Sequence, residues 1–415
     1  MPEPLSSLLL PLAANNRHGL VFSPQTAQLS KSDVPDIFHV GVPFSVTNSW
    51  KSASGGVSRV KDSAILAAIG EGVERYCAAI NQVPTKHKKD ISGQKLLSAE
   101  QWTLFSDTQR QQSEFPFTNL YSDNCLYTNV YEFTTNKEYW VPHPLVVLRD
   151  DYETGIPTSS GLAAGHSSSQ AALRALQELI ERDALMSTWL HSLPGRAIKL
   201  PKQYVKQVAG LYGEVYCFDL TPRYSPFPVI AIAGGIAKRG KWRYSLGVAC
   251  RETLAQAIDK AFLEWCQGVF FAGVYPKYVE TSELTKASDV KSFDDHAIYY
   301  TQNPDEWRNL PLLKNKDKLF KPTVYGKKLT SKTALNLAVN KLNKSGIKLF
   351  YRDLTTIDAL QAGIRVVRVL SPDLVPINSH HDWPFIGGNA NDIRLRYNWA
   401  DTSNKFPSLY PHPLG

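Results

Sequence analysis

The chain has 415 residues, of which 43% are hydrophobic and 20% are charged, and its formal net charge is +8. This composition is ordinary for a globular protein, and it excludes collagen-like, low-complexity and intrinsically disordered chains. The length is sufficient for one large domain or for two smaller domains that share a core.

The N-terminus does not have the features of a targeting segment. Its opening, MPEPLSSLLLPLAANNRHGL, lacks the basic start of a secretory signal, and Pro11 interrupts the short apolar patch. No apolar run reaches membrane-spanning length, so we expect neither export nor a membrane. The cysteines are odd in number and widely spaced, which favours reduced thiols in a cytoplasmic protein over structural zinc. They are Cys77, Cys125, Cys217, Cys250 and Cys266.

Much of the positive charge lies in the lysine-rich stretch 312–348. Such a run can bind nucleic acid. A solvated face around a helix and its flanking loops is the simpler interpretation, and the nearby aromatic residues form no stacking motif. We therefore expect no nucleic-acid partner, although the stretch could also face an acidic protein or peptide.

Six β-branched or aromatic runs predict strands, and several of them alternate in polarity. The segment 228–250 predicts a hairpin that turns at residues 238–240. Helical runs alternate with the strands, which predicts a fold of the α+β (mixed α/β) class. Two stretches, 81–101 and 286–307, have the pattern of insertions or surface connections. The six runs are 37–46, 214–220, 228–235, 242–250, 348–354 and 364–370.

An internal repeat is the most informative feature of the sequence. Segments 54–80, 159–190 and 245–271 each open with a small-residue loop, continue into an amphipathic helix, and place a glutamate late in that helix. In the last two segments, a residue pair at the start of the helix fits a capping box. The pairs are Ser167 with Gln170, and Thr253 with Gln256.

The ends of these helices carry acidic clusters. Two of them contain ExxER and the third contains ExxQ, and residues three or four apart share one face of a helix. A single ExxER is most simply an exposed ion pair. These helices are apolar over much of their circumference, however, so we expect them to be buried, and buried carboxylates need a cation or hydrogen-bond donors. The clusters are Glu71, Glu74 and Arg75; Glu178, Glu181 and Arg182; and Glu264 and Gln267.

Oxygen ligands of this kind suit a hard divalent cation, and magnesium usually arrives with phosphates. Arg75 and Arg182 could then hold phosphate oxygens through their planar guanidinium groups. The sequence contains no GxxxxGK[ST] motif. The pattern therefore indicates a magnesium–nucleotide site that is not built on a P-loop.

These segments resemble the YcaO superfamily, whose signatures include SxxxExxER, a glycine-rich loop leading to ExxER, and a later ExxQ. All three occur here in order, except that Ala67 stands at the family's serine and Ser160 at a frequent asparagine. The resemblance extends from Phe38 to the C-terminus. It implies a YcaO-type ATP-binding fold of repeated strand–loop–helix units, with an N-terminal extension at 1–36 and a catalytic domain at 37–415.

The resemblance also implies roles for the acidic and basic residues. In the family, the matching positions bind ATP and Mg2+, and two residues near the start of the second helix often add nucleotide contacts. It assigns ATP to Glu71, Glu74, Arg75, His166, Gln170, Glu178, Glu181, Arg182, Glu264 and Gln267. It assigns Mg2+ to Glu71, Glu74, Glu178, Glu181 and Glu264.

The tail YPHPLG and the segments 352–378 and 381–388 also resemble the family. A proline-rich C-terminus is typical of azoline-forming members, in which the tail reaches into the active site and the terminal carboxylate assists catalysis. Without the resemblance, a frayed polar tail is the simpler interpretation. With it, the catalytic candidates are Pro411, His412, Pro413 and Gly415, the last as the base.

The implied enzyme is an ATP- and Mg2+-dependent cyclodehydratase of thiazole/oxazole-modified peptide biosynthesis. It phosphorylates backbone amide oxygens of a ribosomal precursor peptide and converts Cys, Ser or Thr into thiazoline, oxazoline or methyloxazoline rings. We expect the leader-recognising, E1-like partner to be a separate polypeptide, because the chain has no room for that domain. An FMN-dependent azoline dehydrogenase is expected in the same complex.

Two other functions remain open from the sequence. One is thioamide or amidine formation within the superfamily, and the other is a non-catalytic peptide-binding scaffold. The triplet His380, His381 and Asp382 fits either a metal site or ordinary surface and packing residues, and the resemblance explains this segment without a metal.

Overall fold

Contacts divide the chain into two compact units. Unit 1 comprises Met1–Ala27, Phe38–Leu179 and Thr330–Pro376, and unit 2 comprises Gln28–Ile37, Ile180–Leu329 and Ile377–Gly415. The predicted mixture of helices and sheets is confirmed. No helix in the described ranges is long and apolar enough to cross a membrane. The structure is a computed structural model that describes residues 13–15, 19–27, 35, 37–42, 54–148, 156, 158–278, 283–401 and 405–414.

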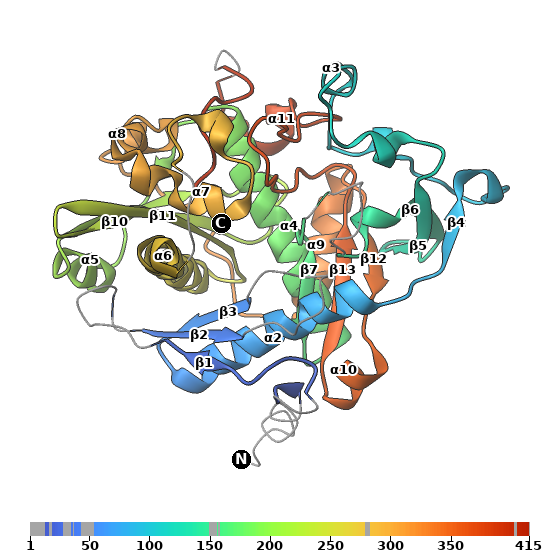
Figure 1. Cartoon of the computed structure of the whole chain (residues 1–415), viewed down its shortest axis with the longest axis horizontal. Coiled ribbons are helices and arrows are strands. Elements are labelled where there is room, and N and C mark those ends of the chain that lie inside the picture. Colours follow the sequence, from blue (N-terminus) through green and yellow to red (C-terminus); the bar gives the residue numbers. More distant parts are fainter. Residues whose placement is uncertain are drawn as a thin grey trace. The chain divides into compact units, whose positions relative to one another are not determined.

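In unit 1, a three-stranded antiparallel sheet carries the first strand–helix pair (Figure 1). The small residues that were expected to form a loop form its last strand, because they let the following helix approach closely. A Cβ atom on Gly56 would lie 2.0 Å from the backbone oxygen of Ala64, so any larger side chain would displace the helix. The elements are β1 (Gln25–Thr26), β2 (Phe38–Val42), β3 (Ser54–Ser58) and α2 (Lys61–Ile80), which packs against β3 and β2.

The second sheet of unit 1 is antiparallel, with the order β4–β5–β12–β13–β7 and with β6 paired to β5. It confirms the strands predicted at 348–354 and 364–370. The stretch 81–101 is largely exposed and contains only one short strand and two 3-10 turns. The elements are β4 (Thr85–His87), β5 (Leu126–Glu132), β6 (Glu138–Pro142), β7 (Leu162–Gly165), β12 (Phe350–Asp353), β13 (Arg365–Leu370), α3 (Asp107–Arg110), α9 (Ser331–Lys344) and α10 (Ile357–Gln361).

Unit 2 contains a four-stranded antiparallel sheet with the order β11–β10–β9–β8. The predicted hairpin is confirmed: Lys238 pairs with Lys241, and the two residues between them, Arg239 and Gly240, have φ values of 52° and 77°. Positive φ at both positions is the signature of a type I′ turn, which matches the twist of the strands. The strands are β8 (Arg196–Ala197), β9 (Gly213–Asp219), β10 (Val229–Lys238) and β11 (Lys241–Cys250).

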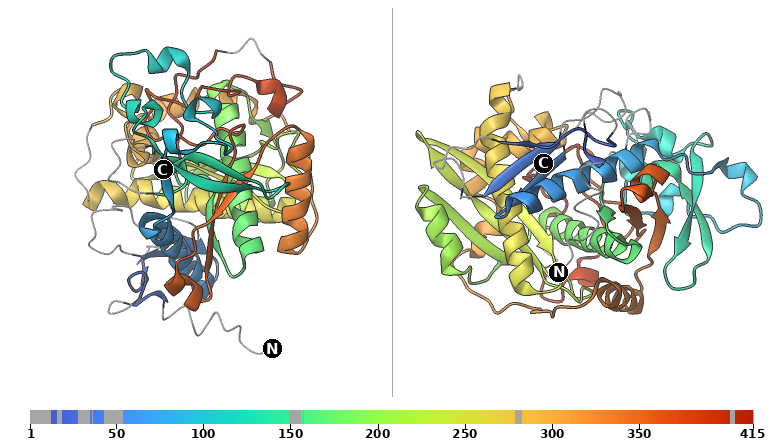
Figure 2. Two further views of the ribbon diagram at one scale, coloured as in Figure 1. Left: turned by 90° about the vertical axis from the view of Figure 1, so that its right-hand side faces the viewer. Right: turned by 90° about the horizontal axis from the view of Figure 1, so that it is seen from below.

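Helix α6 (Leu254–Tyr278) lies against this hairpin (Figure 2). Thr253 caps its start, because the Thr253 hydroxyl accepts a hydrogen bond from the backbone N–H of Gln256 at 3.3 Å. A Cβ atom on Gly247 would lie 2.1 Å from the Ala261 backbone oxygen. The small residues of the repeat therefore serve the same purpose here as in β3. Helix α5 (Lys202–Ala209) packs against β9.

The prediction of a surface connection at 286–307 was wrong. This stretch contains α7 (Phe293–Gln302) and α8 (Pro304–Arg308), and it buries Tyr299, Tyr300 and Trp307 almost completely. Trp307 stacks on Tyr244 of β11, with ring centroids 4.8 Å apart. Aromatic burial, which a count of polar residues does not reveal, therefore makes this stretch part of the core of unit 2.

Helix α4 (Ser168–Leu190) belongs to unit 1 as far as Leu179 and to unit 2 from Ile180 onward. Its predicted cap is present, with the Ser167 hydroxyl accepting from the Gln170 N–H at 3.2 Å. From residue 171 onward every residue is buried except three, which are partly exposed and are spaced four residues apart. That spacing places them on a single strip of the helix. The three residues of this open strip are Arg174, Glu178 and Arg182.

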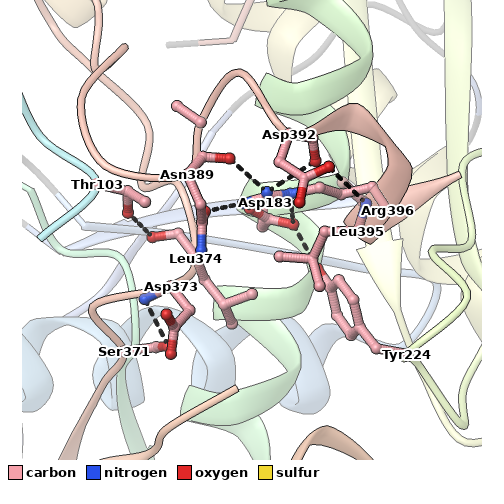
Figure 3. Close-up of polar contacts among 12 residues, drawn as sticks. Thr103, Asp183, Tyr224, Ser371, Asp373, Leu374, Asn389, Asp392, Leu395 and Arg396 are labelled. Carbon is pink, nitrogen blue, oxygen red and sulfur yellow. Dashed lines mark hydrogen bonds and ion pairs between the residues drawn. The ribbon is translucent and has the colours of Figure 1, made fainter. Parts of the chain in front are cut away.

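A fully buried ion pair holds the second half of α4 within unit 2 (Figure 3). The guanidinium of Arg396, on α11 (Ile393–Arg396), lies 2.8 Å from the carboxylate of Asp183, and both side chains are 0% exposed. The hydroxyl of Tyr224 also donates to Asp183. Arg396 donates to the backbone oxygen of Asn389 at 2.8 Å. These hydrogen bonds compensate the desolvation of both charges.

Replacing Arg396 with methionine should leave the Asp183 carboxylate buried without its cation. We expect the free energy of unfolding to fall by about 3–5 kcal/mol, as measured by denaturant titration with circular dichroism. Arg394→Met, at an exposed position on the same short helix, is the matched control and should change stability by less than about 0.5 kcal/mol. Equal losses in the two variants would contradict the role of the buried pair.

Candidate functional site

In unit 1, Glu71 and Arg75 form the fixed part of a charged cluster late in α2. One carboxylate oxygen of Glu71 accepts from the backbone N–H of Gly55 in β3 at 2.8 Å, and the other accepts from Arg75 at 3.0 Å. Burial lowers the pKa of Arg75, but the neighbouring carboxylates outweigh that effect and raise it above its ordinary value. Glu71 thus ties the helix to the sheet and fixes the orientation of Arg75.

Glu74 and Glu178 are two carboxylates of this cluster that act on each other electrostatically. Burial, followed by the negative charge of Glu178, raises the pKa of Glu74 well above its ordinary value, and Arg75 opposes this only in part. Glu178 lies on the open strip of α4, in the part that belongs to unit 1. Two carboxylates that resist ionisation together would be stabilised by a cation between them.

Arg368 is a member of this cluster that the sequence analysis missed. It lies on β13, is 2% exposed, and donates to the backbone oxygens of Leu145 at 3.1 Å and Thr158 at 2.8 Å. Burial lowers its pKa to about 10, while the charges of Glu178 and Glu74 act in the opposite direction. It therefore remains a cation close to both carboxylates. The signal that could have revealed it was an arginine between the apolar residues Val367 and Val369 in the middle of a predicted strand.

The donor set of this cluster fits magnesium with phosphate. The cluster brings the carboxylates of Glu74 and Glu178 close to the guanidinium groups of Arg75 and Arg368. Magnesium takes oxygen ligands and usually binds through one or two carboxylates and substrate phosphates, without a complete protein cage. Among the described residues, no group of three or more His, Cys, Asp or Glu side chains that could hold a metal ion is present.

In unit 2, Glu181 has the structural role that Glu71 has in unit 1. It is 3% exposed, and its carboxylate accepts from the backbone N–H of Cys250, the last residue of β11, at 3.1 Å. The other carboxylate oxygen lies 3.7 Å from the guanidinium of Arg182. Glu181 therefore ties α4 to the hairpin, and Arg182 extends along the open strip.

Helix α6 presents Glu264 and Gln267 as predicted, both partly exposed on a helix whose neighbouring residues are buried. Glu264 forms an ion pair with Lys260, one turn earlier, at 3.1 Å. The sequence analysis did not select Lys260, although its spacing of four residues from Glu264 could have indicated it. The three side chains form a polar row on one face of α6.

His166 lies just before α4, and Gln170 lies in its first turn; both residues belong to unit 1. The side-chain oxygen of Gln170 accepts from the backbone N–H of His166 at 2.8 Å, and His166 is exposed. Gln170 thus shapes the turn before the helix. Their predicted contacts with a nucleotide remain predictions.

The C-terminal segment of unit 2 is ordered without regular secondary structure. Pro411, His412 and Pro413 are buried, and Gly415 lies outside the described residues. The ring of His412 stacks on that of His296 from α7, with centroids 3.7 Å apart and planes at 3°. His412 also donates through Nε2 to the backbone oxygen of Asn378 at 2.7 Å. The structure therefore shows packed residues at 411–413 instead of a frayed tail.

The triplet at 380–382 lies in a loop of unit 2. The backbone N–H of His381 donates to the Val290 oxygen at 3.1 Å. Burial is the main cause that lowers the pKa of both His380 and His381. The interpretation of the triplet as surface and packing residues stays a prediction.

The two stacked histidines predict a pH-dependent stability. Burial lowers the pKa of His412 to about 3 and that of His296 well below its ordinary value, whereas an unfolded histidine titrates near about 6.5. Between these values the unfolded chain binds protons that the folded chain does not, so stability is lost as the pH falls below about 6.5.

We therefore expect the free energy of unfolding of His412→Gln to depend less on pH than that of the wild type, by up to about 1.4 kcal/mol per pH unit. Denaturant titrations between pH 5 and pH 7 measure this difference. His87→Gln, at an exposed position, is the control and should keep the wild-type slope. A wild-type slope in His412→Gln as well would contradict the assignment.

Comparison with known proteins identifies the family. The family model described as YcaO cyclodehydratase, ATP- and Mg2+-binding, matches residues 55–375. The fold is similar to that of a "Heterocyclase in complex with substrate and Cofactor", at 20% identity and a TM-score of 0.74 over 98% of this chain and 57% of that chain. A search of curated protein sequences found no match.

Two other solved structures share the fold. YcaO from Methanopyrus kandleri, bound with AMPPCP and Mg2+, is 16% identical with a TM-score of 0.62 over 86% of each chain. A chain of the E. coli microcin synthetase McbBCD complex is 15% identical, with a TM-score of 0.62 over 91% of this chain and 95% of that one. The chain spans only 57% and 48% of the two heterocyclases it matches. Since the family model matches well over half of its length and the fold agrees, the chain belongs to the YcaO cyclodehydratase family, which binds ATP and Mg2+.

Proposed function

We propose that the chain is the catalytic subunit of a complex that uses ATP to form azoline rings in a ribosomal precursor peptide. The observation that best supports ring formation is the ordered C-terminal segment, in which Pro411, His412 and Pro413 are buried. The positive charge of Arg182 contributes to lowering the pKa of His412, after burial and His381. The segment therefore lies within electrostatic reach of an arginine that the family resemblance assigns to the nucleotide.

Mg-ATP is assigned to the charged residues late in α2, α4 and α6. Glu74 and Glu178 are the carboxylates best suited to the metal, because they are close enough for the charge of Glu178 to raise the pKa of Glu74. Glu71 and Glu181 each use one oxygen on a backbone N–H. The proposed nucleotide contacts are Arg75, Arg182, Gln267, His166 and Gln170, and the proposed metal ligands also include Glu71, Glu181 and Glu264.

In the proposed reaction, a Cys, Ser or Thr side chain attacks the preceding backbone carbonyl carbon. The amide oxygen must then leave, and ATP supplies the phosphoryl group that lets it leave as phosphate instead of hydroxide. The amide nitrogen loses its proton as the C=N bond forms, and the carboxylate of Gly415 is the proposed base. The work of the protein is to orient the peptide and to stabilise charge, as in phosphoryl transfer generally.

The proposed partners are the precursor peptide, an E1-like leader-recognition protein and an FMN-dependent azoline dehydrogenase. One of the similar structures is titled a microcin synthetase complex with pro-MccB17 bound, which supports assembly with a peptide and other subunits. We place the reaction in the cytoplasm, since the five cysteines are buried thiols.

Glu178→Gln should abolish ring formation, because it removes one of the two carboxylates that face the proposed metal. We expect a loss of about 100-fold or more, measured by mass spectrometry as the absence of the one-water loss that each ring produces. The assay contains the E1-like partner, the precursor peptide and Mg-ATP. Glu283→Gln, at an exposed position, is the control. Wild-type turnover by Glu178→Gln would overturn the site assignment.

Chelation of divalent metal should stop both ATP hydrolysis and ring formation, and excess Mg2+ should restore them. A product that gains sulfur instead of losing water would show thioamide formation. Failure of the complete complex to hydrolyse ATP would favour a peptide-binding scaffold. Each outcome is read from the product mass and from phosphate release in one reaction.

A further inference from the structure

The C-terminal segment is held through three consecutive backbone carbonyl groups. Trp189 donates through Nε1 to the oxygen of Tyr410 at 2.7 Å. The hydroxyl of Tyr300 donates to the oxygen of Pro411 at 2.6 Å. His296 donates through Nδ1 to the oxygen of His412 at 2.7 Å, because a carbonyl oxygen can only accept. All three donors and the segment belong to unit 2.

The composition of the segment explains why side chains provide these donors. Pro411 and Pro413 have no N–H, so residues 410–414 cannot form a regular ladder with a neighbouring strand. Buried carbonyl groups still require donors, since leaving them unsatisfied is costly. Side-chain donors therefore satisfy the carbonyl groups of Tyr410, Pro411 and His412.

Packed aromatic rings hold α7, the helix that carries His296 and Tyr300, in place. Tyr300 packs edge-on against Trp307 at 5.5 Å, and Trp307 stacks on Tyr244 at 4.8 Å. Tyr244 in turn stacks on Trp242 at 5.3 Å, with the planes at 2°. This aromatic row joins α7 and α8 to β11. Since stacked buried rings have little freedom to move, the Tyr300 hydroxyl is held at a defined position.

The third donor, Trp189, lies on α4 one residue before Leu190. The backbone oxygen of Leu190 accepts from the N–H of Ser408 at 2.8 Å. The same helix carries Arg182, two turns earlier. The segment is thus attached to the helix that bears one of the proposed nucleotide contacts, as well as to α7.

We propose that Tyr300, His296 and Trp189 are positioning residues that hold the C-terminal segment for the ring-forming step, and that nucleotide binding does not require them. The inference rests on the proposed function, because only ring formation uses the segment. It gives α7 a role in holding the C-terminal segment, although this helix contains none of the site residues predicted from the sequence. It also predicts that ATP use and ring formation can be separated by changing α7 alone.

The test compares Tyr300→Phe with Tyr299→Phe in the complete complex with partner and precursor peptide. Both variants lose only a hydroxyl from a buried ring. The Tyr299 hydroxyl donates to Glu306 at 2.9 Å and not to the segment. We expect Tyr300→Phe to form about tenfold fewer rings per ATP hydrolysed, with an unchanged KM for ATP, and Tyr299→Phe to match the wild type in both quantities.

Backbone hydrogen exchange of residues 405–414 provides an independent readout. It should be faster in Tyr300→Phe, and faster still in the double variant with Trp189→Phe, while the melting temperature of Tyr299→Phe and Tyr300→Phe stays similar. The positioning role would be overturned if Tyr300→Phe formed as many rings per ATP hydrolysed as the wild type and also showed wild-type backbone hydrogen exchange. A parallel loss of ATP affinity would also overturn it, because it would show a general structural defect. If the wild-type complex itself forms no rings, the proposed function fails, and the positioning role fails with it.

Discussion

The buried ion pair between Asp183 and Arg396 is the interaction on which the functional part of unit 2 depends. Asp183 follows Arg182 directly on α4, so the pair fixes the rotation of the helix about its axis. Only one rotation puts Arg174, Glu178 and Arg182 on the open strip and buries the remaining residues. A buried pair of this kind adds little net stability compared with apolar packing, but removing one partner leaves the other charge buried and unpaired. Its contribution is therefore the specification of one arrangement.

The two ExxER motifs of the repeated strand–helix units bond to a strand through glutamates at different positions. In α2 it is the first glutamate of ExxER, Glu71, that bonds to the preceding strand, and in α4 it is the second, Glu181, that bonds to β11. Two copies of one motif therefore assign their glutamates differently. Burial and the charge of Glu178 raise the pKa of Glu74, which also accepts a hydrogen bond from the backbone N–H of Ala164. A cation near the two carboxylates would favour their ionised forms.

Much of the local structure could be predicted from the sequence, because it depends on short-range rules. The turn at Arg239 and Gly240, the caps at Ser167 and Thr253, and the acidic ends of the three helices all follow from residues close together in the chain. The small residues before the first two helices were misinterpreted as loops. They form strands, since their size matters for the approach of a helix, which is a tertiary contact.

The sequence by itself determined the family, the helices and the acidic and basic residues that they carry, since spacing along a helix fixes which side chains share a face. Only the tertiary structure decided which backbone N–H groups bond to Glu71 and Glu181. It also brought Arg368 from a distant strand to Glu74 and Glu178, and placed α7 beneath the C-terminal segment. The contacts of Arg368 with Glu74 and Glu178, and those of α7 with the C-terminal segment, join residues more than a hundred positions apart. No local pattern of polarity or spacing records such contacts.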